Sequence, residues 1–452
     1  MNSLAIEILS WIGPADTGST EDATLASLKI TTPEQPPITT VEDSIARTVR
    51  THINVPTYPL SQWLIINWWR LRWEPRHNSA LQSTQWLHAH SIAAIGSDYA
   101  WPNLQIASDG EFINLHLEPE TSFDASAIRY LQSTNIDIPA HRFELAIDNL
   151  IASSIERLSD CIPGDKTLTD LHAELTEERA DAEVSRRYRL QAIAGIDPGS
   201  ASPYWLKKAA ELTSLTDPKG AQEIMAVVPN LRGGLNKAIQ TIEAMRQSPE
   251  TIQLDWAQHL SFKPFKDEPP WKKGERIAAE LRRQLNIAPG PIPTAFFKKH
   301  LGAKLPLDRS IWRGDKSFVG GFVDSTQGGR TKVLIPTHRE DNQRFYLARL
   351  IGSALLASSD QTVLPVSSAI TALQKFERAF AQEFLCPWRE LDEFTNRHGL
   401  DDESIEEASR HFNVSQLLIL STLVNNKKLP MSRLASISGG GDIGPSRSTS
   451  VR

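Results

Sequence analysis

Three prolines interrupt the chain between Phe262 and Pro270, within the run Phe-Lys-Pro-Phe-Lys-Asp-Glu-Pro-Pro. Proline fixes its backbone φ angle and lacks an N–H group, so a regular helix ends at such a stretch. A chain of 452 residues is also long enough to build more than one hydrophobic core. The sequence therefore predicts several domains, with one boundary at this proline-rich segment.

The composition narrows the class of protein. Hydrophobic residues make up 40% of the chain and charged residues 23%, which excludes collagen-like, coiled-coil and wholly disordered proteins. The formal net charge of −6 gives no general attraction to phosphate backbones. Non-specific binding of nucleic acid by the whole surface is therefore not expected.

The two cysteines and the N-terminal residues indicate in which cellular compartment the protein is expected. Cys161 and Cys386 lie far apart and offer neither a disulfide framework nor a cysteine-based zinc site. Residues 1–10 include Glu7 and lack the basic start and the small-residue cleavage site of a signal peptide. No stretch approaches the roughly 20 apolar residues that span a bilayer. We expect a cytoplasmic protein.

Residues 1–135 are predicted to form a Trp-rich α+β domain. Residues 24–31 alternate like a strand, and 103–117 resemble a hairpin with its turn at Asp109-Gly110. The tryptophans at 63, 68, 69 and 73 interleave with the arginines at 70, 72 and 76. Such a segment can stack on single-stranded nucleic acid or bind a protein, but buried rings beside arginine stems are the stronger expectation.

His88 and His90 resemble a pair of metal ligands at first sight. Their alternate spacing suits a strand, and no third ligand is evident nearby, so we do not expect a metal there.

Helical periodicity predicts a helical middle domain over residues 136–262, and a second α+β domain is predicted over 270–430. Within the latter, helices are expected at 273–285, 296–301, 344–356 and 369–385, and strands at 318–324 and 332–336. Residues 431–452 turn to Ser, Gly, Arg and Thr, which predicts a disordered tail. The predicted fold class is thus multidomain α+β.

The order of motifs in 270–430 resembles the ImmA/IrrE metallopeptidase family, whose fold is zincin-like. The segments that carry the resemblance are Gly274–Arg282, Gly320–Ser325, Thr331–Pro336, Arg344–Ala348, Glu377–Pro387 and Ile405–Ser415. In that family, one helix presents two histidines four positions apart as zinc ligands, and the glutamate between them polarises the metal-bound water.

The resemblance implies that the catalytic groups are missing. Matching the family's motif places Arg349 at the first histidine, Leu350 at the glutamate and Ser353 at the second histidine. The third ligand falls on Phe376, and the adjacent Glu377 is rotated away by about 100° if the chain is helical. Arg349 would also place a permanent positive charge where the cation should lie. We therefore expect no metal, no cofactor and no catalytic residue.

Two other functions remain open. A peptidase with a non-standard site could use Ser353 or His338, although Ser353 has no Lys or His one helical turn away. A helix pair within 405–424 could read DNA as a transcriptional regulator does. Its second helix has almost no side chains suited to base edges, so packing within the domain is the stronger expectation.

The favoured hypothesis is a catalytically inactive ImmA/IrrE-like protein that acts by protein recognition. A peptidase cleft without catalysis can bind a polypeptide segment by strand addition. We expect Arg349, Glu377 and His338 to contact that partner. The resemblance implies a bacterial protein with a role in regulation, in phage defence or on a mobile element. Its implied partner is a helix-turn-helix repressor or a defence or toxin component, rather than nucleic acid or a membrane.

Overall fold

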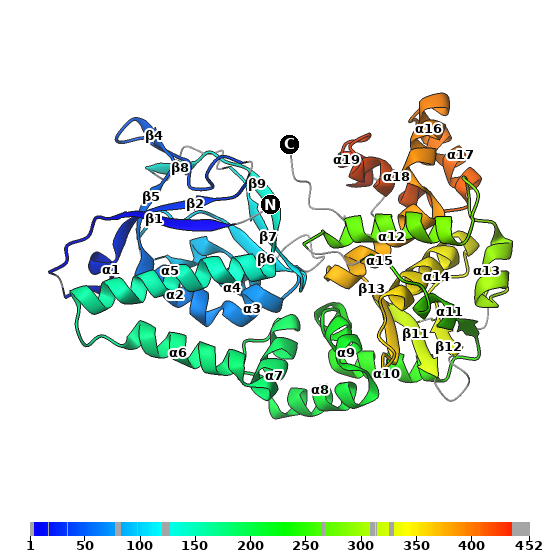
Figure 1. The fold of residues 1–452 in the computed structure, drawn as a ribbon, viewed down its shortest axis with the longest axis horizontal. Coiled ribbons are helices and arrows are strands. Elements are labelled where there is room, and N and C mark those ends of the chain that lie inside the picture. The colour runs from blue at the N-terminus through cyan, green and yellow to red at the C-terminus, as the bar shows by residue number, and fades with distance from the viewer. Residues whose placement is uncertain are drawn as a thin grey trace. The chain divides into compact units, whose positions relative to one another are not determined.

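The computed structural model describes residues 4–16, 18–33, 35–76, 83–96, 98–119, 127–263, 267–307, 312, 314–324 and 330–435. These residues divide into two compact units, within Met1–Ala201 and Ser202–Arg447, each a mixture of helices and antiparallel sheets (Figure 1). The predicted multidomain α+β class is confirmed. Of the predicted disordered tail, 436–452 lies outside the described residues.

The first unit contains small antiparallel sheets. Their strand orders are β1-β2-β5, β6-β7-β9 and β4-β3-β8. The strands are β1 (Ala5–Trp11), β2 (Leu25–Thr31), β3 (Val41–Asp43), β4 (Thr48–Arg50), β5 (Ile53–Pro56), β6 (Gln105–Ser108), β7 (Phe112–Leu117), β8 (Ile128–Tyr130) and β9 (Thr134–Pro139). The predicted strand at 24–31 is confirmed as β2. The predicted hairpin is confirmed as β6 and β7, with Ser108 paired to Ile113 across the Asp109-Gly110 turn.

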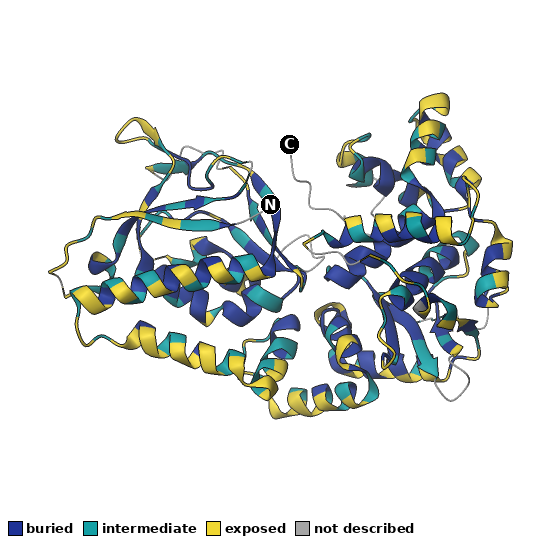
Figure 2. Ribbon diagram, viewed as in Figure 1, coloured by how far each residue is buried: buried dark blue, intermediate teal, exposed yellow. Residues whose placement is uncertain are grey.

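Helices complete the first unit. They are α1 (Thr20–Ala23), α2 (Thr57–Ile66), α3 (Trp68–Trp73), α4 (Thr84–His90), η1 (Ile92–Ile95), α5 (Ala140–Cys161), α6 (Thr167–Ala180) and α7 (Ala182–Ile193). Helix α5 places Phe143, Ile147 and Ile151 in the same core as the strands. By contrast, α6 is exposed along most of its length (Figure 2).

The tryptophans of α2 and α3 belong to this core, as predicted. Trp63, Trp68 and Trp69 are at most 9% exposed. Trp73 is partly buried, and the guanidinium groups of Arg72 and Arg189 each lie 3.9 Å from its ring centroid. These rings therefore pack within the unit and do not form an open stacking platform.

The two histidines at 88 and 90 lie on helix α4 rather than on the predicted strand. Ser83 caps the N-terminus of this helix, and its hydroxyl accepts a hydrogen bond from the Trp86 N–H at 3.1 Å. His88 is exposed, whereas His90 is buried with its ring nitrogens 2.6 Å from the Ile106 carbonyl and 2.9 Å from Glu74 Oε2. The two side chains thus lie in different environments.

The helices predicted as a middle domain over 136–262 are divided between the two units. Helices α5, α6 and α7 belong to the first unit. The second unit begins with α8 (Pro203–Leu215), α9 (Pro218–Met225), η2 (Val228–Asn230) and α10 (Gly234–Arg246). Periodicity identifies helices but not the sheet that covers their apolar faces, and here α10 packs against strands far along the chain.

The second unit is built on an antiparallel sheet of order β10-β12-β11-β13. The strands are β10 (Thr251–Gln253), β11 (Phe318–Asp324), β12 (Arg330–Leu334) and β13 (Val363–Ser367). Thr251 pairs with Lys332, so the chain on both sides of the proline-rich segment forms one sheet. The described residues of this segment before Pro270 are not helical, but the segment does not separate two domains as predicted. Its residues 264–266 lie outside the described ones.

Further helices complete the second unit. They are α11 (Asp255–Gln258), α12 (Pro270–Gln284), α13 (Thr294–Leu301), α14 (Glu340–Leu355), α15 (Ala372–Leu385), α16 (Trp388–His398), α17 (Asp402–Phe412), α18 (Gln416–Asn425) and α19 (Ser432–Ala435). The predicted helices and strands of 270–430 are present, with ends shifted by a few residues. Among the described residues, no helix is both long enough and apolar enough to cross a bilayer.

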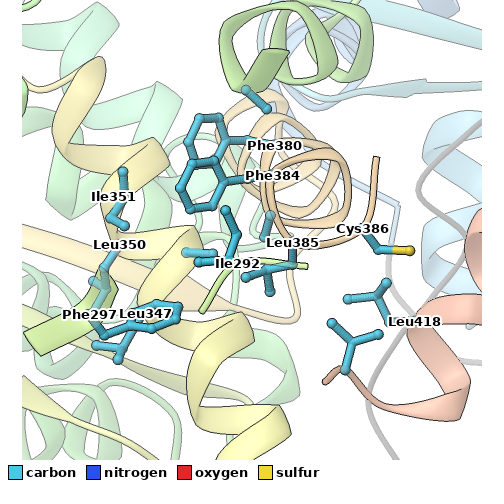
Figure 3. Packing of buried hydrophobic residues seen from close by; sticks show 14 of the residues in the cluster. Ile292, Phe297, Leu347, Leu350, Ile351, Phe380, Phe384, Leu385, Cys386 and Leu418 are labelled. Carbon is cyan, nitrogen blue, oxygen red and sulfur yellow. The ribbon is translucent and has the colours of Figure 1, made fainter. Parts of the chain in front are cut away.

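Helices α14 and α10 cover opposite faces of the sheet. A side chain at Gly321 would point toward Leu350 of α14, whereas the neighbouring Phe322 lies under Arg246 of α10. On the α14 side, Leu350 and Ile351 share a core with Phe380 and Phe384 of α15 (Figure 3). This core holds α14 and α15 side by side.

The predicted packing of the 405–424 helix pair is also confirmed. Every residue from Leu418 to Val424 is buried, and Ser421 of α18 accepts a hydrogen bond from Gln382 of α15 at 2.9 Å. Helix α18 is thus an internal helix of the second unit.

Candidate functional site

Four charged side chains meet inside the second unit, where α9, α14 and α15 adjoin the end of β13. They are Glu223, Arg349, Glu377 and Arg378, which we call the charge cluster. Their exposed fractions are 9%, 6%, 0% and 7%. Buried charges are rare in proteins unless they are paired, so this cluster is the first candidate for a functional site.

The spacing of residues along α14 places two polar side chains of the site on one face of the helix. Arg349 and Ser353 are four positions apart on α14, so they share the face that lies toward α15. Phe376 and Phe380 of α15 lie against Gly352, where an added Cβ would stand 3.0 Å from the Phe380 ring. The absence of a side chain at Gly352 lets the two helices approach closely.

Arg349 is the centre of the cluster. Its Nη2 lies 3.4 Å from Glu377 Oε2 and donates hydrogen bonds to the Ser367 carbonyl, at 2.8 Å, and to Gln374 Oε1. Arg378 donates to the same Ser367 carbonyl at 3.2 Å. Two guanidinium groups therefore converge on one backbone oxygen.

Glu223 reaches the cluster from α9. Its Oε2 accepts a hydrogen bond from the Thr371 hydroxyl at 2.6 Å. With Glu223 and Glu377 ionised, the four formal charges sum to zero. The cluster is thus formally neutral, although it lies almost entirely out of contact with water.

Two buried nitrogens of the cluster have no hydrogen-bond partner among the described residues. These are the Nε atoms of Arg349 and Arg378, whereas Glu377 interacts with Arg349 and with the Ser353 hydroxyl. Nearly all buried polar groups in proteins are hydrogen-bonded, and an unsatisfied one costs about 1–3 kcal/mol.

Burial shifts the ionisation of these groups. Desolvation raises the pKa of Glu377 to about 8, opposed by the nearby Arg349, and raises the pKa of Glu223 to about 7. Desolvation lowers the pKa of Arg378 to about 9, and it also lowers the pKa of Arg349. The two carboxyl groups thus change charge near neutral pH.

The predicted site residues fall in three environments. Arg349, Ser353 and Glu377 lie together, Leu350 and Phe376 belong to the hydrophobic core, and His338 is exposed in the loop before α14. The residue of α15 that faces Arg349 is Glu377 rather than Phe376. Phe376, one position away and rotated by about 100°, packs in the hydrophobic core instead.

The structure does not favour the predicted partner contacts of Arg349 and Glu377. Both side chains are buried and face each other, so neither reaches a partner in this conformation. Glu223, Gln374 and Arg378 were not singled out from the sequence. Arg378 follows Glu377 directly, which could have drawn attention to it, whereas nothing in the sequence links α9 to this site.

The cluster does not fit a zinc ion. Among the described residues, no group of three His, Cys, Asp or Glu side chains could hold a metal. In the cluster, Glu377 faces a guanidinium, which cannot lose its proton to coordinate a cation. No catalytic step through a metal follows from this arrangement.

Comparison with protein-family models, with curated proteins and with solved structures gives no match for this chain. The resemblance to ImmA/IrrE proteins therefore rests on the order of motifs within residues 270–430.

Proposed function

We propose that residues 270–430 form an ImmA/IrrE-like pseudo-peptidase domain, and that the chain acts by recognising another protein rather than by hydrolysis. The observation that carries this proposal is the buried pair of Arg349 and Glu377. By the resemblance, Arg349 stands where the family has its first zinc-binding histidine. A guanidinium thus supplies internally the positive charge that a metal would supply.

This replacement removes the chemistry as well as the metal. A zinc-bound water is acidic enough to become a nucleophile, whereas a guanidinium offers only hydrogen bonds and charge. Ser353 is 1% exposed, and Leu350 replaces the general base that the resemblance would require. Both Ser353 and Glu377 are buried, so in this conformation neither would reach a peptide bond of a substrate.

Protein recognition is the function that remains for such a domain. The resemblance suggests a helix-turn-helix repressor, or a component of a defence or toxin system, as the partner. A regulatory role in phage defence or on a mobile element would follow. A cytoplasmic location agrees with Cys161 and Cys386, both free thiols.

No observation favours either alternative function, the peptidase with a non-standard site or the DNA-binding regulator. A peptidase using Ser353 and His338 would need them in contact, but His338 is exposed before α14 while Ser353 is buried in its last turns. A DNA reader needs an exposed recognition helix, whereas α18 is buried from Leu418 to Val424.

Elemental analysis of protein purified without an affinity tag tests the proposal directly. We expect far less than one zinc per chain, together with no cleavage of a denatured casein substrate. The matched variants replace His88, His90 or His338 singly by alanine. About one zinc per chain that any of these variants loses would overturn the proposal and favour an enzyme.

A further inference from the structure

Three side chains of the first unit form a stack where α3 and α7 pack against each other (Figure 1). The guanidinium groups of Arg72 and of Arg189, which lies on α7, are each 3.9 Å from the ring centroid of Trp73. Two guanidinium groups so close to one ring do not fit side by side on the same face. The two arginines therefore cover opposite faces of Trp73, where each cation is attracted by the electrons of the ring.

Arg72 has its own partners within the unit. Its Nε donates a hydrogen bond to Glu144, and its Nη1 donates to the Gly110 carbonyl at 3.0 Å. Only 12% of its side chain is exposed. The charge of Arg72 is thus compensated by one carboxylate, and its guanidinium group is fixed on one face of Trp73.

Arg189, by contrast, has no acidic partner. Among the described residues, no carboxylate pairs with its guanidinium group and no oxygen accepts a hydrogen bond from it. Its Nε is buried, whereas its two Nη atoms are not among the buried ones and reach solvent. The open end of this guanidinium group therefore presents unused N–H donors at the surface of the unit.

The sequence of α7 explains why Arg189 is unpaired. Arg186 of the same helix pairs with Glu183, three positions earlier, at 2.5 Å. The positions three and four away from Arg189 carry Ser185, Arg186, Ala192 and Ile193. The helix thus offers Arg189 no carboxylate within reach.

The stack holds more positive charge than its surroundings compensate. Arg72 and Arg189 carry two positive charges, and Glu144 is the carboxylate that acts on both. Burial lowers the pKa of Arg189, the charge of Arg72 lowers it further, and Glu144 opposes both effects. A guanidinium group nevertheless stays charged at neutral pH. Among the described residues, one positive charge of the stack is therefore left without an anion.

We propose that Arg189 binds an oxyanion, the phosphate or carboxylate group of a small ligand, through its two Nη atoms. A guanidinium group is planar, and its parallel N–H groups match two oxygens of such an anion. Stacking on Trp73 fixes this plane before the ligand arrives, which lowers the entropy lost on binding.

The stack also limits what the ligand can be. Because the two arginines cover both faces of Trp73, no aromatic base can stack on this ring. The charged group of the ligand is thus the part that this site recognises. The site belongs to the first unit, so it is independent of the function proposed for residues 270–430.

Titration of the full chain with inorganic phosphate and with acetate tests the site, with sodium chloride added to keep the ionic strength constant. The readout is the indole N–H resonance of Trp73 in nuclear magnetic resonance spectra, identified by its loss in Trp73→Phe. We expect a saturable shift with at least one of the two anions, and the stronger binder shows whether the ligand presents a phosphate or a carboxylate group. No saturable shift with either anion would overturn the proposal.

A set of variants locates the binding group. Arg189→Gln should bind the anion at least about tenfold more weakly, because it removes two charge-assisted hydrogen bonds. Arg189→Lys keeps the charge but loses the fork, so it should also weaken binding. Arg187→Gln is the matched control, since Arg187 is an exposed arginine of the same helix whose guanidinium group lies 5.2 Å from the Tyr188 ring centroid. Equal affinities for Arg187→Gln and both Arg189 variants would place the anion elsewhere and overturn the proposal.

Discussion

Arg349 of α14 and Glu377 of α15 form an ion pair inside the second unit, with Nη2 of the arginine 3.4 Å from Oε2 of the glutamate. Moving two charges out of water costs several kcal/mol per ion, which their attraction offsets only in part. Besides Arg349, the Ser353 hydroxyl interacts with the Glu377 carboxylate. The pair therefore fixes two side chains in place more than it stabilises the fold.

Removing one partner of this pair should be more harmful than removing both. At a pH above the Glu377 pKa of about 8, Arg349→Ala leaves the ionised Glu377 without its partner, and we expect a loss of about 3–5 kcal/mol in the free energy of unfolding. Arg349→Met combined with Glu377→Leu should lie close to the original stability. Urea denaturation measures both. Arg339→Ala, at an exposed position before α14, is the control, and equal midpoints for it and Arg349→Ala would show that Arg349 is not buried as described.

The raised pKa values of Glu377 and Glu223 predict a pH dependence of stability. Each carboxyl group binds its proton more tightly when folded, with pKa values of about 8 and about 7 against an ordinary 4.5. The folded state therefore holds more protons in this window, and the stability from these groups falls as pH rises from about 5 to about 8. Glu377→Gln, which stays neutral, should flatten this decline in urea midpoints. An identical slope in both proteins would contradict the assigned titration of Glu377.

A further prediction follows from the proposed likeness of α14 and α15 to a zincin site. Arg349→His with Ser353→His places two imidazoles four positions apart on α14, facing the Glu377 carboxylate. We expect this double variant to bind about one zinc per chain, measured by elemental analysis and competition with a chelator. Adding Glu377→Ala should weaken zinc binding. If the double variant folds but binds no zinc, α14 and α15 are not arranged as a zincin site.

Local features of the sequence predicted local structure well. The Asp109-Gly110 turn between alternating strands identified the β6–β7 hairpin, and helical spacing identified α14 and α15. The domain boundary predicted at the proline-rich segment was wrong, because Thr251 pairs with Lys332 and joins segments that lie far apart in the chain. Neither turn residues nor hydrophobic periodicity predict such a long-range strand pairing. The proline-rich segment between the two strands resembled a linker.

Part of the candidate site could be predicted from the sequence, because it depends on local spacing along one helix. Arg349 and Ser353 follow from spacing on one helix, but Glu377 required a count across a second helix, where one position changes the face by about 100°. Glu223 enters from α9 through its hydrogen bond to Thr371, and Gln374 binds the edge of β13. Both contacts depend on tertiary packing, which the sequence pattern did not reveal.

Gly274 gives a final prediction, on the contact between α12 and α15. A Cβ at this position would lie 2.5 Å from the Phe376 carbonyl oxygen and 2.8 Å from the Phe380 nitrogen, both backbone atoms that cannot rotate away. Gly274→Ala must therefore separate the two helices and disturb the face that carries Glu377. We expect a loss of about 1–3 kcal/mol in the free energy of unfolding, as is common for overpacked interiors. Gly18→Ala is the matched control, since a Cβ there meets nothing within 4 Å. Thermal unfolding of the two variants measures the difference, and a Gly274→Ala protein as stable as Gly18→Ala would show that α12 and α15 are less closely packed than described.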